Sequence, residues 1–144
     1  MAARLVAFVM LSVGLAMGTA RAQECLHGPN ESAEQLARRR EALMATRTIN
    51  NIQANQPGAA SRQYLRYEEL SGSRYALSMR TPTPAAPVSR ISLDPGTDIL
   101  PNWELKLDVN PAGYWFMIRD KADPCGFAFI SNQAGVIFSA EPIH

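Results

Sequence analysis

The side chains of this chain best suited to nucleophilic or metal chemistry are two cysteines and two histidines. Cys25 and Cys125 lie near opposite ends of the chain, His27 follows the first cysteine closely, and His144 is the last residue. A reactive thiol is typical of a Cys-x-x-Cys pair or a cationic neighbour, and a structural zinc ion needs four ligands. The sequence has no Cys-x-x-Cys motif, and His27 is the one histidine near a cysteine. We therefore predict no metal site, no cofactor and no catalytic residue among these side chains.

Two carboxylates flank Lys121 just before the second cysteine, in the stretch RDKADPCG. Asp120 and Asp123 could in principle form an acid/base pair or bind calcium, but calcium loops have an alternating Asp/Asn pattern that is missing here. Acidic residues are common in turns because their side chains accept hydrogen bonds from nearby backbone N–H groups. We interpret both residues as turn formers. Since nucleophile-elbow, dinucleotide and phosphate-loop motifs are also missing, we predict that the protein is not an enzyme.

The first 22 residues are typical of a cleaved secretory signal peptide. Arg4 supplies the positive start, residues 5–17 are apolar or small, and residues 20–22 (Ala-Arg-Ala) match a small-x-small cleavage site. The apolar run is shorter than the roughly 20 residues that a membrane-spanning helix needs. We expect cleavage after Ala22, export to the periplasm or the cell exterior, and no membrane insertion of the mature chain.

Residues 23–144 are long enough for one domain with a single core. They include 12 of the 14 Lys and Arg residues and all 13 Asp and Glu residues, so their net charge gives no reason to expect a nucleic-acid partner. In an exported chain the two cysteines have a single intramolecular pairing. We predict a disulfide between Cys25 and Cys125. Chain-entropy models assign a disulfide that closes so long a loop a stabilisation of about 4–5 kcal/mol.

One helix is predicted between a cap at Asn30 or Ser32 and a stop at residues 56–58 (Gln-Pro-Gly). Its residues on one face at helical spacing are Ala42, Ala45, Ile49 and Ile52. Because this apolar stripe starts partway along, we expect only the second half of the helix to meet a sheet. Arg38, Arg39 and Arg40 fan around the helix axis, so we interpret them as a solvated face.

The last third of the sequence predicts an antiparallel meander. Residues 103–109 alternate strictly between apolar and polar side chains. Three further strands follow at 114–120, 127–131 and 136–142, separated by the turn sequences NPAG and NQAG and by the connection KADPCG. A meander of about four strands needs a cover for its apolar face. The predicted fold class is therefore α+β, with the N-terminal helix packed on the sheet.

The residues between helix and meander are less regular. We expect a short helical turn ending at Gly72, a short strand at 74–79, and a proline-rich loop around 81–101. Within the meander, Trp115 and Met117 point away from the face that Tyr114 and Phe116 share. The proline-rich loop either covers this pair or leaves it exposed as a contact surface; coverage by the loop is the simpler alternative.

Two blocks of the sequence resemble the globular domain of bacterial type IV pilins and type II secretion pseudopilins. They are ATRTINNIQANQ…YLRYEELSG, a helix end followed by a Leu-Ser-Gly turn, and GYWFMIRDK…CGFAFISNQAGVIFSAEP, similar to the terminal pilin hairpin. The chain departs from that family at its start, because it lacks the Gly-Phe-Thr-Leu-x-Glu processing site and the long apolar helix that polymerises.

The resemblance implies a free, exported pilin-like domain that binds a protein of the cell envelope, in a pilus or type II secretion apparatus. The alternative is a small periplasmic ligand-binding or inhibitor protein unrelated to pili. An apolar cleft of ligand size would favour the alternative, whereas a flat or edge-strand surface would favour protein contact.

Overall fold

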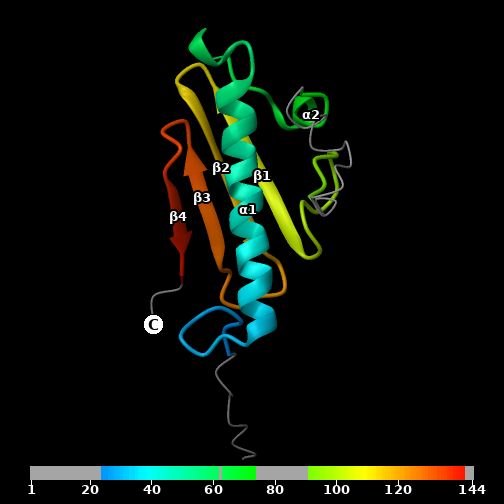
Figure 1. Ribbon diagram of the computed structural model, residues 1–144, viewed down its shortest axis with the longest axis vertical. Helices are drawn as coiled ribbons and strands as arrows, with labels where there is room; N and C mark the ends of the chain where they lie inside the picture. The colour runs from blue at the N-terminus through cyan, green and yellow to red at the C-terminus, as the bar shows by residue number, and fades with distance from the viewer. Residues whose placement is uncertain (1–23, 62, 74–90, 142–144) are drawn as a thin grey trace, which may run out of the picture.

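A single long helix lies along one face of a four-stranded antiparallel sheet in the computed structural model, which describes residues 24–61, 63–73 and 91–141 (Figure 1). The elements in chain order are α1 (Ala33–Asn55), the 3-10 turn η1 (Ala59–Ser61), α2 (Tyr67–Leu70), β1 (Trp103–Asn110), β2 (Gly113–Asp120), β3 (Ala128–Asn132) and β4 (Ile137–Ala140). The predicted α+β class is confirmed. The strand predicted at 74–79 and the first part of the proline-rich loop, 81–90, lie outside the described residues.

The sheet is a meander in which each strand pairs with the next, in the order β1-β2-β3-β4. Its turns form where the sequence predicts them. The Asn110 side chain accepts hydrogen bonds from the backbone N–H groups of Ala112 and Gly113, and Gly135 has a positive φ of 72° in the turn before β4. Each turn thus uses a residue suited to tight chain reversal, Asn for its side-chain acceptor and Gly for its backbone freedom.

The start and end of α1 follow from local chemistry. The Ser32 hydroxyl accepts from the backbone N–H of Gln35, and the Gln35 side chain accepts from the backbone N–H of Ser32, which forms a capping box. The helix ends at Asn55, and Gln56 is already extended, as expected for the residue before a proline.

The core lies between the second half of α1 and the sheet. The buried residues of α1 begin at Ala42, as the shifted apolar stripe predicts. Ile49 and Ile52 are fully buried in the same apolar cluster as Leu105, Phe116, Ile118, Phe127 and Phe129. Strand alternation is also confirmed, because Tyr114, Phe116 and Ile118 are buried beneath the helix while Trp115 is exposed.

A polar bridge ties α1 to the sheet near the C-terminal end of the helix. Asn50 donates from its side-chain amide to the hydroxyl of Ser131 at 2.9 Å, and its side-chain oxygen accepts from the Tyr114 hydroxyl at 3.1 Å. Burial, with a smaller contribution from nearby Tyr64, raises the pKa of Tyr114 to about 12. The phenol therefore stays protonated and donating at neutral pH, which fixes the side chain of Asn50 against the sheet.

The packing of α1 predicts a contrast between two substitutions in the same helix. Ile49→Ala should lower the free energy of unfolding by about 2–5 kcal/mol, because it leaves a cavity beneath the helix. Arg40→Ala, at an exposed position of the helix, should change it by less than about 0.5 kcal/mol. Urea denaturation of the oxidised protein measures both values, and equal losses would show that α1 is not packed as described.

Candidate functional site

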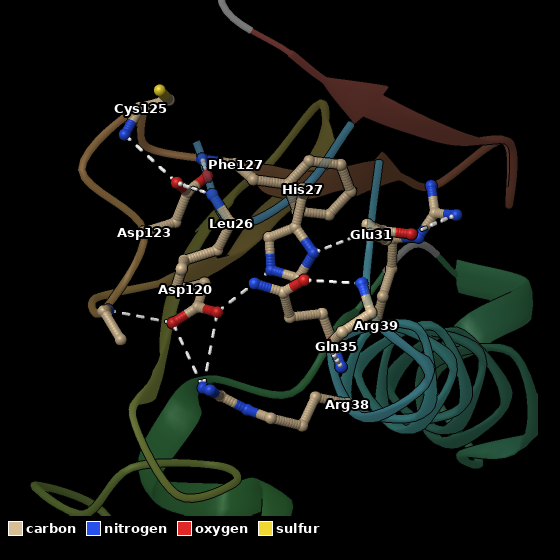
Figure 2. Close-up of polar contacts among 12 residues, drawn as sticks. Leu26, His27, Glu31, Gln35, Arg38, Arg39, Asp120, Asp123, Cys125 and Phe127 are labelled. Carbon is tan, nitrogen blue, oxygen red and sulfur yellow. Dashed lines mark hydrogen bonds and ion pairs between the residues drawn. The ribbon is translucent and has the colours of Figure 1, made fainter. Parts of the chain in front are cut away.

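A group of polar side chains, buried at its centre, lies between the N-terminal segment, α1 and the end of β2 (Figure 2). We define this polar cluster as His27, Glu31, Arg38, Arg39, Asp120 and Asp123. His27 is only 5% exposed, and its imidazole ring lies against Phe127, with ring centroids 4.5 Å apart, and against Trp103 at 5.6 Å. The histidine is thus part of the hydrophobic core as well as of the polar cluster.

Both nitrogens of the His27 ring face carboxylates. Nδ1 lies 2.7 Å from a carboxylate oxygen of Glu31, and Nε2 lies 3.0 Å from a carboxylate oxygen of Asp120 (Figure 2). Each ring nitrogen of His27 therefore has a carboxylate oxygen within hydrogen-bond distance.

Two arginines complete the charge balance around these carboxylates. Arg38 lies 3.4 Å from Asp120, and Arg39 lies 2.8 Å from Glu31. The prediction that both arginines belong to a solvated face is wrong, since each binds a buried carboxylate and its side chain is only about one-third exposed. Buried carboxylates need such partners because an unpaired buried charge is strongly destabilising.

Asp123 organises the connection between β2 and β3. One carboxylate oxygen accepts from the backbone N–H groups of Leu26 and Cys125, and the other accepts from that of Phe127. The prediction that the two aspartates are turn formers is correct for Asp123, and Asp120 also accepts from the N–H of Ala122 at 2.9 Å. In addition, each aspartate binds the N-terminal segment across the fold, which the turn interpretation did not include.

The predicted disulfide is present beside this cluster. Cys25 and Cys125 are bonded, with their Cα atoms 5.3 Å apart. The bond and Asp123 hold the same two segments together, because Asp123 binds the residue after Cys25 and also the N–H of Cys125. His144, the second histidine considered as a ligand, lies outside the described residues.

The arrangement is suited to holding segments together rather than to reacting with a substrate. A general base needs a nitrogen within hydrogen-bond reach of the proton that it abstracts. In this cluster both ring nitrogens of His27 already face carboxylate oxygens, and the ring is enclosed by aromatic side chains. Within the described residues, no group of three or more His, Cys, Asp or Glu side chains could hold a metal ion.

The second candidate is the outer face of the sheet, which we define as the face opposite α1. Strand registers place Lys106 opposite Met117, Met117 opposite Ile130, and Ile130 opposite Phe138. These four side chains form a row across the sheet, which we call the outer row. Trp115 lies on the same face two residues from Met117 and is 45% exposed, and Phe138 is 57% exposed.

The residues predicted as a contact surface, Trp115 and Met117, therefore lie side by side on the outer face. The alternative in which the proline-rich loop covers this pair falls partly on residues 81–90, which lie outside the described residues, and almost half of the Trp115 surface is exposed. The outer row also includes Ile130 and Phe138, which the sequence reasoning did not name. Strand alternation in residues 127–131 and 136–142 indicates which side chains share a face of the sheet. It does not give the strand register, which places Ile130 beside Met117 and Phe138 in the structure.

Two surface hollows offer an alternative site. One, of about 310 Å³, has a lining that includes Glu34, Arg38 and Glu41 of α1 together with Leu100, Pro101 and Trp103. The other, of about 230 Å³, lies between α2 and β1. Ligand pockets usually measure about 300–1,000 Å³ and are mainly apolar. The first hollow is at the lower end of that range and the second is below it, and charged side chains are prominent in the lining of both.

Comparisons of the chain with protein-family models, curated protein sequences and solved structures find no match. Within the described part of the chain, no helix is both long enough and apolar enough to cross a membrane. The geometry of the polar cluster and of the outer face is therefore the basis for a functional proposal.

The polar cluster predicts a strong effect of one buried carboxylate. Asp120→Ala should lower the free energy of unfolding by about 3–5 kcal/mol, because it leaves Arg38 without its counter-ion and Nε2 of His27 without its carboxylate partner. Asp108→Ala is the matched control, since Asp108 is an exposed carboxylate on the neighbouring strand, and it should change stability by less than about 0.5 kcal/mol. Similar losses for both variants in urea denaturation would contradict a stabilising role for the cluster.

Proposed function

We propose that the protein is an exported, non-enzymatic, pilin-like domain that acts by binding another protein of the cell envelope through its outer face. The observation that carries this proposal is the exposed aromatic and aliphatic surface on the side of the sheet opposite α1. Exposed apolar side chains gathered in this way are typical of protein contact sites, and Trp is among the residues that contribute most to binding energy.

The surroundings of Trp115 fit a protein partner better than a small ligand. The outer face is one side of a regular sheet, and Trp115 pairs across strands with Asp108 and Asn132. Charged side chains flank the apolar surface, because Glu104 binds Arg119 at 2.5 Å on the same face. An apolar centre with a polar rim is the usual composition of a protein interface.

Two further observations support the remaining parts of the proposal. The helix-before-meander order supports the pilin-like interpretation, and a pilus or type II secretion apparatus is accordingly the proposed setting of the partner. The Cys25–Cys125 disulfide supports export, because such bonds persist mainly in oxidising compartments.

Export predicts a defined mass for the mature protein. Protein isolated from the periplasm or the medium should begin at Gln23, and its intact mass should be two hydrogens lower than that of the same chain after reduction. A retained leader, a lipid adduct on Cys25 or two free thiols before reduction would contradict the prediction.

Site-specific photo-crosslinking tests the contact role of the outer face. With p-benzoylphenylalanine in place of Trp115, irradiation of intact cells should give a discrete adduct with one envelope protein, which mass spectrometry identifies. The same substitution at Arg40, an exposed residue of α1, is the matched control and should give no such adduct. Equal labelling from both positions, or no adduct from Trp115, would overturn the proposal.

A further inference from the structure

The two edges of the sheet differ in how well they are protected against pairing with another strand. Edge strands expose backbone hydrogen-bonding groups, and natural proteins usually protect them with charged side chains, prolines or covering segments. Edge strand β1 has Glu104, Lys106 and Asp108 along it. Its start is also covered, because the N–H of Ile99 donates to the carbonyl of Trp103.

Edge strand β4 has none of these protections among its own residues. It consists of Ile-Phe-Ser-Ala and follows Gly135 and Val136, without a charged residue or proline in this stretch. Val136 is 51% exposed and Phe138 is 57% exposed. In the sheet order β4 is paired on one side, with β3, and Figure 1 shows it at the margin of the sheet, beside β3.

A second copy of the chain has the chemistry that this edge would accept. A two-fold axis through Phe138 would place Phe138 opposite its own counterpart, Ile137 opposite Ser139, and Val136 opposite Ala140. Symmetric pairing of a charged edge strand would bring like charges together, which is unfavourable. In this register β4 brings no like charges together, and Glu141, the residue after it, would lie opposite Gly135.

The outer row also continues across such a pairing. On one copy the row ends at the edge with the exposed ring of Phe138. Pairing about Phe138 would join the apolar part of the row, Met117, Ile130 and Phe138, to the same three residues of the second copy. A Lys106 side chain would then stand at each far end, where it stays in solvent.

We propose that β4 binds β4 of a second copy in antiparallel register centred on Phe138, which forms one continuous sheet across the dimer. This inference goes beyond the proposed function, because it assigns a partner to the β4 edge of the sheet rather than to Trp115 on the outer face. A strand of four residues buries less area than a stable interface of about 800 Å² per partner. We therefore expect a transient dimer with a dissociation constant on the order of 10–100 μM.

Sedimentation of the oxidised mature protein over a wide concentration range tests the proposal. Wild-type protein should shift from monomer toward dimer as concentration rises through the micromolar range. Phe138→Lys should weaken association at least about tenfold, because it removes the aromatic pair and places two lysines opposite each other. An equimolar mixture of Phe138→Lys and Phe138→Glu should restore dimers, since the opposite charges then meet.

Trp115→Lys is the matched control, because Trp115 lies on the outer face but on β2, away from the paired edge. Its dimerisation should match that of the wild type if the copies pair through β4. If the dimer instead formed by packing two outer faces together, this variant would lose it. A wild-type monomer at all concentrations, a mixture that fails to pair, or equal losses from Trp115→Lys and Phe138→Lys would each overturn the proposal.

A second measurement covers the case in which a substituted protein fails to fold. Backbone amide exchange of wild-type β4 should slow as protein concentration rises, while exchange in β1 should not change; concentration-independent exchange in β4 would overturn the proposal.

Failure of the dimer and failure of the proposed function are distinguishable. A monomer that still gives the envelope adduct from Trp115 would refute only the dimer, whereas dimers without that adduct would refute only the proposed function.

Discussion

The structure depends on covering the apolar face of a four-stranded sheet with a helix that is apolar along only half of its length. Residues from Ala42 onward supply the buried face of α1, so the end of the sheet beneath the first half of the helix needs another cover. The N-terminal segment provides it, because the ring of His27 packs on Phe127 and Trp103. The disulfide and Asp123 hold that segment in place.

Using a histidine as part of the core cover creates a requirement for polar partners. Its ring nitrogens must be hydrogen-bonded because a buried polar group without a partner is costly. Glu31 and Asp120 provide these partners, and Arg38 and Arg39 in turn bind the two carboxylates. The charged first half of α1 and its apolar second half thus perform complementary tasks in one helix.

The sequence was sufficient for the local features of the fold and insufficient for the long-range polar contacts. Alternation in β1, the cap at Ser32 and the turns at Asn110 and Gly135 depend on near neighbours, so local rules predicted them. The contact between His27 and Asp120 joins residues 93 positions apart, and no periodicity encodes it. The sequence did contain a signal that Asp120 is buried, because this residue continues the buried alternation of β2. The partners of its carboxylate are distant in sequence and are seen only in the folded structure. The same limit applies to the outer row. Alternation assigns its residues to one face of the sheet, but only the strand registers show that they lie beside one another.

The Cys25–Cys125 bond also determines how the domain would carry mechanical tension. A pull applied upstream of Cys25 and downstream of Cys125 would pass directly through the sulfur–sulfur bridge, and the chain between them would bear no load. This bypass shields α1, β1 and β2, together with the His27 contacts. The load would fall on β3 and β4, which lie after Cys125. Since β4 is short and, among the strands that the structure describes, pairs with β3 alone, it would peel away first, while the helix and the first hairpin stay folded.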